Sequence, residues 1–135
     1  MIAQTDTDTL TSMKSATKSI LVVDDEFDVR AIVELILGMQ NYDVVTTPSA
    51  LLALEKLQGE QPPALILTDR MMPVMDGVEF CERVRANPQW RDVPIIMMSA
   101  ADEPKERNQG LWNAYLHKPL DMDDLLHAVE RIIGR

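Results

Sequence analysis

Short apolar runs alternate with longer amphipathic stretches along most of the chain. The runs are rich in Val, Ile, Leu and Met, which is typical of strands that are buried on both faces of a parallel sheet. Five such segments predict five strands: Ile20–Val23, Tyr42–Thr47, Ala64–Thr68, Pro94–Met98 and Ala114–His117.

The stretches between these runs repeat their apolar residues with the period of a helix. A first helix is expected from about Asp28, acting as its cap, to Met39, and a second helix has Leu51, Leu54 and Leu57 on its inner face. Strands that alternate with helices predict an α/β fold. The second helix is expected at Ser49–Gln58. Two further helices are expected at Val78–Ala86, with Phe80, Cys81 and Val84 inward, and from about Asp121 onward.

One interval is too short for a regular helix. Only 18 residues separate Ser99 from Lys118, and Pro104 and Gly110 interrupt them. A crossover with its helix needs at least about 10–12 residues besides the strand. We therefore expect a shortened or irregular fourth helix at about Pro104–Gln109, or none, in the most mobile part of the domain. Trp112 is expected to pack over the gap.

Composition sets the class of protein. A chain of 135 residues with 46% hydrophobic content predicts one domain, at residues 19–135, after a flexible tail at residues 1–18. The chain has no apolar stretch of the roughly 20 residues that a membrane span needs, no secretory signal, and a single cysteine, Cys81. Its net charge of −9 argues against nucleic-acid binding. We expect a cytoplasmic protein that binds neither membrane nor nucleic acid.

Four of the five runs end on residues with reactive or metal-binding side chains. Asp24-Asp25, Asp69, Ser99 and Lys118 each follow a different run. Because the carboxyl ends of parallel strands meet at one edge of a sheet, these side chains should converge there. Taken singly, an Asp pair also fits a helix-capping turn, and a lone Asp, Ser or Lys fits a solvated position. The four together favour a site for a divalent cation and a phosphoryl group.

The motifs around these residues resemble the receiver domain of two-component response regulators. They are Val22-Val23-Asp24-Asp25-Glu26, the segment from Asp69 through Met72-Pro73 to Asp76-Gly77, Met98-Ser99-Ala100, and Tyr115-Leu116-His117-Lys118-Pro119. The resemblance covers roughly residues 19–133. It implies a flavodoxin-like, doubly wound sheet of five parallel strands in the order 2-1-3-4-5.

The resemblance assigns Asp69 as the phosphoacceptor, a carboxylate nucleophile that forms an aspartyl phosphate. Neighbouring carboxylates raise one another's pKa unless a cation neutralises them, so Mg²⁺ is the expected cofactor. Its expected ligands are Asp25, Asp69, the backbone carbonyl of Met71, and Asp24 either directly or through water. Lys118 and Ser99 would bind phosphoryl oxygens.

Three further positions match family features. Tyr115 matches the family's switch aromatic and is equally compatible with a half-buried strand tyrosine. Pro119 is implied to follow a cis peptide bond, and Gly77 is expected to give a turn its backbone freedom. Met75 is expected to fill the core, with a contribution to an exposed contact surface as the alternative. Apolar Met71 beside Asp69 predicts slow hydrolysis of the aspartyl phosphate.

The leading functional prediction is a single-domain response regulator with no output domain. A sensor histidine kinase or a histidine phosphotransfer protein would phosphorylate Asp69, which switches the face that binds a downstream protein still to be identified. Direct action on a target and onward phosphotransfer both stay open. The alternatives are a receiver-like interaction module that is never phosphorylated and an aspartyl-nucleophile phosphohydrolase. Met71, two residues after Asp69, offers no acid or base for the latter, so we expect a phosphoacceptor that only assists its own phosphorylation and dephosphorylation.

Overall fold

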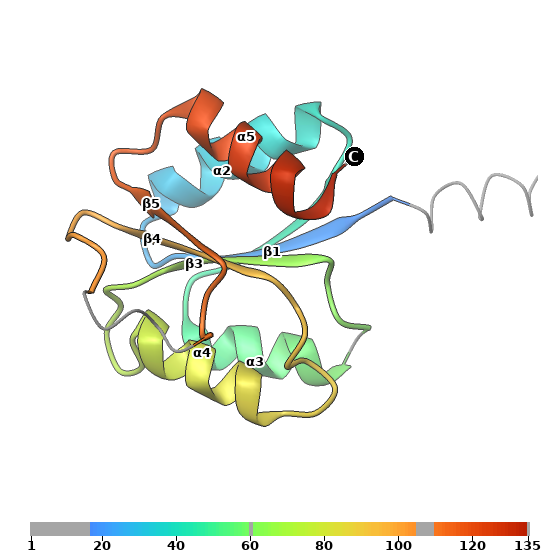
Figure 1. Cartoon of the computed structure of the whole chain (residues 1–135), viewed down its shortest axis with the longest axis vertical. Coiled ribbons are helices and arrows are strands. Elements are labelled where there is room, and N and C mark those ends of the chain that lie inside the picture. Colours follow the sequence, from blue (N-terminus) through green and yellow to red (C-terminus); the bar gives the residue numbers. More distant parts are fainter. Residues whose placement is uncertain (1–16, 60, 105–109, 135) are drawn as a thin grey trace, which may run out of the picture.

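A computed structural model of the protein describes residues 17–59, 61–104 and 110–134, which form a three-layer α/β domain (Figure 1). The strands are β1 (Ser19–Val23), β2 (Asp43–Thr47), β3 (Leu65–Asp69), β4 (Ile95–Ser99) and β5 (Ala114–His117). The helices of the described part are α2 (Phe27–Met39), α3 (Ala50–Gly59), α4 (Gly77–Ala86) and α5 (Met122–Ile133).

All five strands are parallel and lie in the order β2-β1-β3-β4-β5. Helices α2 and α5 cover one face of the sheet, and α3 and α4 cover the other (Figure 1). The predicted fold class and strand order are therefore confirmed. In this topology the order in which strands are added to the sheet reverses between β1 and β3, and the carboxyl ends of these two strands form the crevice where open α/β sheets bind ligands.

The core consists of two apolar layers, one on each face of the sheet. Alternate residues of β1 supply them: Leu21 and Val23 face α3 and α4, whereas Ile20 and Val22 face α2 and α5. Every residue of β3 and β4 is buried, as expected for central parallel strands. This packing fixes the strand ends, and with them the backbone positions of the site residues.

Two helices differ in detail from their predictions. Helix α2 begins at Phe27, and Glu26 rather than Asp28 holds the N-cap position, without a side-chain cap. The predicted cap is wrong because the preceding turn is closed by Asp24, whose Oδ1 accepts a hydrogen bond from the Glu26 amide at 2.9 Å. Helix α3 buries Ala50, Ala53 and Leu57, and Leu51 is 49% exposed. Its inner face is therefore formed largely by small residues, which shifts it from the predicted leucine stripe.

The crossover between β4 and β5 contains no helix in residues 100–104 and 110–113, the parts that the structure describes. The rest of the expected short helix, and the mobility predicted for it, concern residues 105–109, outside the described residues. Trp112 is only 5% exposed, joins the core layer under α3 and α4, and donates from Nε1 to Glu103 Oε2 at 2.8 Å. This contact draws the two ends of the crossover together.

Arg85 anchors the same region from α4. Its Nη1 atom donates to the carbonyls of Arg91 at 2.9 Å and Val93 at 2.7 Å, and its Nε donates to Gly110 O at 3.2 Å. These bonds tie the end of α4 to the chain before β4 and to the chain before β5. Residues 1–16 of the predicted tail lie outside the described residues. None of the described helices is long and apolar enough to cross a membrane.

Candidate functional site

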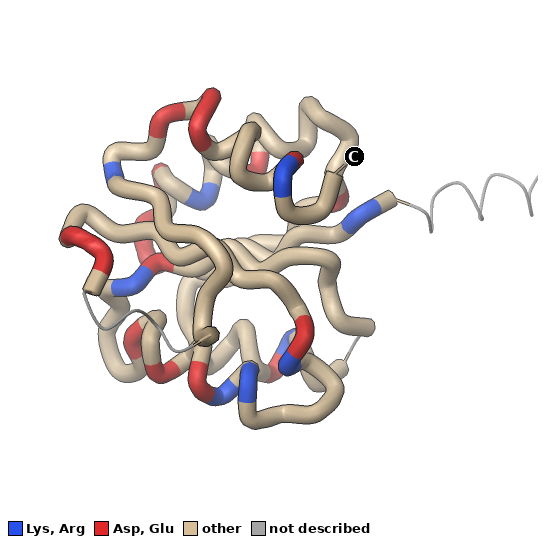
Figure 2. The backbone as a smooth tube through the Cα atoms, viewed as in Figure 1, with Lys and Arg blue, Asp and Glu red and all other residues tan. Residues whose placement is uncertain are grey.

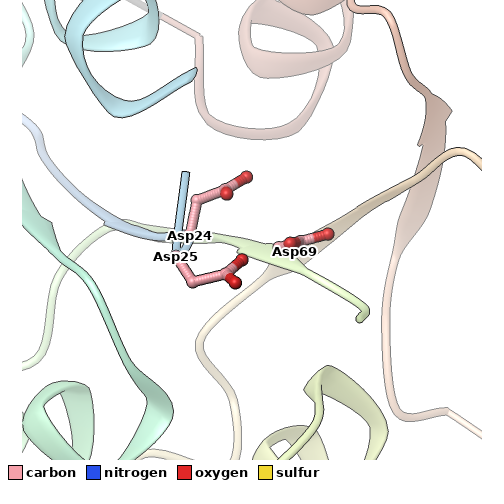
Figure 3. Close-up of side chains that lie close together, drawn as sticks. All are labelled: Asp24, Asp25 and Asp69. Carbon is pink, nitrogen blue, oxygen red and sulfur yellow. The ribbon is translucent and has the colours of Figure 1, made fainter. Parts of the chain in front are cut away.

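Three carboxylates meet at the predicted edge of the sheet. Asp24 and Asp25 directly follow β1, and Asp69 is the last residue of β3. One oxygen from each lies within 4.8 Å of the others. Figure 3 shows the three side chains extending into the same space beyond the strand ends. The backbone arrangement that brings them together is the parallel pairing of β1 with β3, in which Val23 lies opposite Thr68.

The two aspartates of the pair have different surroundings. Asp24 is fully buried: Oδ1 accepts from the Glu26 amide, and Oδ2 accepts from Lys118 Nζ at 2.7 Å. Its backbone carbonyl also accepts from Arg30 Nη1 at 2.7 Å. Asp25 is exposed at the mouth of the site. Asp24 is therefore built into the protein by hydrogen bonds, whereas the Asp25 carboxylate faces solvent.

Lys118 brings a single ammonium group to this acidic cluster. Its Nζ lies 2.7 Å from Asp24 Oδ2, 2.9 Å from Glu26 Oε1 and 3.3 Å from Asp69 Oδ1. The Lys118–Pro119 peptide bond is cis, as the family resemblance implies. Burial alone lowers the pKa of the Lys118 ammonium, but its hydrogen bonds to Asp24 and Glu26 and the charges of Asp24 and Asp69 outweigh burial and raise it. The side chain is therefore a fixed positive charge.

The surroundings of Asp69, unlike those of Lys118, favour the neutral form of the side chain. Its residue is 4% exposed, and burial together with the negative charge of Asp24 raises the pKa of the carboxyl from 3.8 to about 6. The charge and hydrogen bond of Lys118 lower this pKa but do not cancel the increase. The ionised form of Asp69 is thus held in a place that disfavours it. A bound cation would relieve this cost.

Ser99 and Tyr115 lie on the β4 and β5 side of the site. Ser99 ends β4, is 1% exposed, and its Oγ accepts from the Ala101 amide at 3.1 Å. The Lys118 amide donates to Ser99 O at 2.8 Å, which joins the ends of β4 and β5. Tyr115 is half-buried and donates from its hydroxyl to Ala101 O at 2.8 Å. Tyr115 therefore contacts the loop after Ser99 and not the three carboxylates.

Gly77 holds the turn after β3 against the strand. Its amide donates to Arg70 O at 2.7 Å, and an added Cβ would lie 2.3 Å from Asp69 O and 2.8 Å from Arg70 Cα. Space, rather than the expected backbone freedom, explains glycine here. Asp76 then caps α4 by accepting from the Glu79 amide at 2.9 Å.

The turn between Asp69 and Gly77 decides between the two roles considered for Met75. Met75 is 5% exposed and belongs to the core, which confirms core filling and rules out an exposed contact surface. Val74 adopts a left-handed backbone conformation, with φ of 70°, and its side chain is 90% exposed. This conformation turns Val74 outward and Met75 inward. Met71, at 66% exposure, lies at the surface beside the site.

Two residues without a predicted role contact the site residues. Glu26 binds Lys118, and Arg70 donates from Nη1 to the Tyr115 hydroxyl at 3.2 Å. The only sequence signal for Glu26 was a third acidic residue beside the Asp pair, and for Arg70 its position next to Asp69. Cys81, by contrast, is a core residue, and burial raises the pKa of its thiol to about 12.

The donor set fits a small, hard divalent cation. The side chains of the cluster offer three carboxylate oxygens, the kind of ligand that Mg²⁺ prefers, which leaves further coordination positions for water or other oxygen ligands. One lysine cannot neutralise the cluster, and the pKa of Asp69 is raised by burial first and by the negative charge of Asp24 second. Asp25 and Asp69 are the residues that would hold such an ion, with Asp24 behind them.

Comparisons with known proteins agree with this architecture. Residues 20–130 match the model of the response regulator receiver domain. Chemotaxis protein CheY4 of Vibrio cholerae is 31% identical, with a TM-score of 0.80 over 86% of this chain and 98% of that one. The receiver domain of a Pseudomonas aeruginosa sensor histidine kinase, solved with magnesium in its active-site cleft, is 29% identical, with a TM-score of 0.78 over 88% of this chain and 99% of that one.

Full-length relatives contain more than this chain. Response regulator MprA of Mycobacterium ulcerans is 36% identical over 119 residues, which are 86% of this chain and 50% of that protein. The transcriptional regulator RpaA of Synechocystis is 30% identical over 119 residues, or 86% of this chain and 49% of that protein. The chain thus spans about half the length of the curated relatives that it matches. Its fold, strand-end site and family match together place this chain in the family of response regulator receiver domains.

Proposed function

We propose that the protein is a phosphorylation-controlled switch in which Asp69 accepts a phosphoryl group from a phosphohistidine in a Mg²⁺-dependent reaction. Receiver domains are non-enzymatic signalling modules that histidine kinases phosphorylate. The observation that carries the proposal is the position of Asp69: a buried carboxylate 3.3 Å from the Lys118 ammonium and within reach of two further aspartates. This donor set supports a site for a phosphoryl group and a metal ion.

The proposed transfer is a displacement at phosphorus. An Asp69 carboxylate oxygen forms a P–O bond as the P–N bond of the donor breaks, and the electron pair of that bond leaves on the imidazole nitrogen, which takes up a proton. Asp25 and Asp69, with the Met71 carbonyl, are proposed to hold Mg²⁺, which neutralises charge on the phosphoryl oxygens when bound. Lys118 and Ser99 are proposed to bind the remaining oxygens. In this way the receiver assists a reaction whose histidine is supplied by its partner.

A groove beside the site supports a protein donor. It has a volume of about 680 Å³ and is lined by Glu26 and Lys118 at the site and by Val29, Ile32 and Leu120 further out. Phe27, which is 71% exposed, lies on helix α2 together with Val29 and Ile32. Acidic and basic segments both gather at this end of the sheet, at the left of Figure 2. We propose that the histidine-bearing helix of the kinase or phosphotransfer protein occupies this groove, because the groove reaches Lys118, whose Nζ lies 3.3 Å from Asp69 Oδ1.

Intact-mass measurement tests the proposal. The protein is incubated with phosphoramidate and Mg²⁺, and the expected result is a gain of one phosphoryl group in the wild type, no gain in Asp69→Asn, and no gain with EDTA. Glu55→Gln is the matched control, because it also replaces one carboxylate by an amide, on the exposed side of α3. A wild type that gains no phosphoryl group, or an Asp69→Asn variant that gains it equally, would contradict the proposal.

A further inference from the structure

Arg70 connects the phosphoacceptor strand to the loop on the far side of the site. Its Nη1 atom donates to Asp102 O at 3.2 Å and to the Tyr115 hydroxyl at 3.2 Å. The Arg70 backbone is itself fixed, because its amide donates to Met98 O at 2.8 Å and its carbonyl accepts from Gly77. The guanidinium therefore extends from a rigid base directly after Asp69.

The loop that Arg70 contacts also forms a hydrogen bond with Ser99. The Ala101 amide donates to Ser99 Oγ, and Ala101 O accepts from the Tyr115 hydroxyl at 2.8 Å. Asp102 adds a contact to His117, with Oδ1 3.3 Å from Nε2. Residues 99–102 are thus tied to β5 through Tyr115 and to β3 through Arg70.

The Tyr115 ring is held from both sides. Its centroid lies 6.1 Å from that of Trp112 and 5.7 Å from that of His117, the latter in an edge-on arrangement. Aromatic contacts of this kind stabilise the position of the ring beyond the effect of burial. The ring contacts alone do not specify where the hydroxyl points. The hydrogen bonds from Arg70 and to Ala101 do, and they fix Tyr115 against the loop.

We propose that Arg70 is a positioning residue that holds the loop Ala100–Asp102 and the Tyr115 hydroxyl in the resting arrangement. The inference rests on the proposed phosphorylation of Asp69. A phosphoryl group that takes a hydrogen bond from Ser99 draws this loop toward Asp69, and the bonds from Arg70 to Asp102 and Tyr115 break. These bonds then stabilise only the unphosphorylated state. A ligand that binds only the phosphorylated arrangement must break these bonds. Its affinity is therefore lowered by the factor with which the bonds favour the unphosphorylated state.

Beryllofluoride, which adds to a carboxylate as a phosphoryl mimic, provides the test. Its affinity in saturating Mg²⁺ is measured by tryptophan fluorescence, with calorimetry as a second readout. Arg70→Ala should tighten binding by about tenfold, the effect of one or two hydrogen bonds from a charged donor. Tyr115→Phe, which removes the acceptor but keeps the ring, should also tighten it. In the Tyr115→Phe background the effect of Arg70→Ala should shrink, since the hydrogen bond between Arg70 and Tyr115 is already lost and only the bond from Arg70 to Asp102 remains to be removed.

Arg83→Ala is the matched control, because Arg83 lies on exposed α4 surface and pairs with Glu79. It should leave the affinity unchanged. Weaker beryllofluoride binding in Arg70→Ala would mean that Arg70 contacts the phosphoryl group itself. Unchanged binding would mean that Arg70 does not hold the loop in its resting arrangement. Either result overturns the inference. Tyr115→Phe gives an independent answer where Arg70→Ala fails to fold. A wild type that binds no beryllofluoride would instead count against the proposed function.

Discussion

Replacing Asp69 with Asn should stabilise the metal-free protein at neutral pH, although it removes the proposed phosphoacceptor. The Asp69 carboxyl has a pKa of about 6 in the folded protein and 3.8 as its ordinary value, because burial and Asp24 disfavour the ionised form. At about 1.4 kcal/mol per pKa unit, this difference costs the folded state roughly 3 kcal/mol once the group is fully ionised. An amide resembles the neutral carboxyl and avoids this cost.

The sign of the pH dependence follows from the raised pKa. The stability that the protonated Asp69 carboxyl contributes is fully present below about pH 3.8 and is lost as the pH rises through about 6. The Asn variant does not titrate, so it keeps that stability. Its advantage over the wild type should therefore be small near pH 3.5, should reach about half of its full value near pH 5, and should approach roughly 3 kcal/mol by pH 7.5.

Urea unfolding in EDTA, followed by circular dichroism at several pH values, measures this difference. Glu55→Gln should show no comparable gain, since Glu55 lies exposed on α3. Added Mg²⁺ should narrow the difference, because a cation that binds the ionised cluster stabilises the folded wild type more than the variant. An Asn variant no more stable than wild type at pH 7.5, or an advantage independent of pH, would refute the reasoning.

Three further outcomes are expected. Asp25→Asn should weaken Mg²⁺ binding, measured by calorimetry, by at least about tenfold and slow phosphorylation with it, whereas unchanged affinity would remove Asp25 from the ligand set. Met71→Asn should accelerate loss of phosphate from Asp69, followed by mass spectrometry, because an amide can orient the attacking water. Gly77→Ala should destabilise the fold by about 1–3 kcal/mol in urea, since its Cβ meets backbone atoms, whereas Gly38→Ala, with nothing within 4 Å, should not.

The convergence of the site could be predicted because it depends on backbone topology. Apolar runs mark the strands, parallel order brings their carboxyl ends to one edge, and the residues after each run must then meet. Asp24, Asp25, Asp69 and Lys118 were found together for this reason. The exposed and buried members of the Asp pair could not be told apart, since both lie in one turn and only the packed structure decides which is covered.

Side-chain contacts between distant segments could not be predicted in the same way. Arg70 and Tyr115 are 45 residues apart, and Lys118 and Glu26 are 92 apart. Long side chains such as these choose among many rotamers, and the choice depends on where the other acceptors lie. Val74 shows a similar limit of local rules: a β-branched residue disfavours the left-handed region, yet the turn adopts it there. The exposure of Val74 and the burial of Met75 follow from that one dihedral angle.

The charges at the site explain why the proposed phosphorylation of Asp69 should need a cation. Three carboxylates, on Asp24, Glu26 and Asp69, contact the ammonium of Lys118, and Asp25 adds a fourth carboxylate to the cluster. Lys118 lies closer to Asp24 and Glu26 than to Asp69, so a phosphoryl group on Asp69 must compete for it while adding negative charge. Glu26 is exposed and can return to water at little cost, whereas Asp24 cannot. The contact that yields is therefore Glu26–Lys118, and the charge that remains is the physical reason to expect a divalent cation beside Asp25.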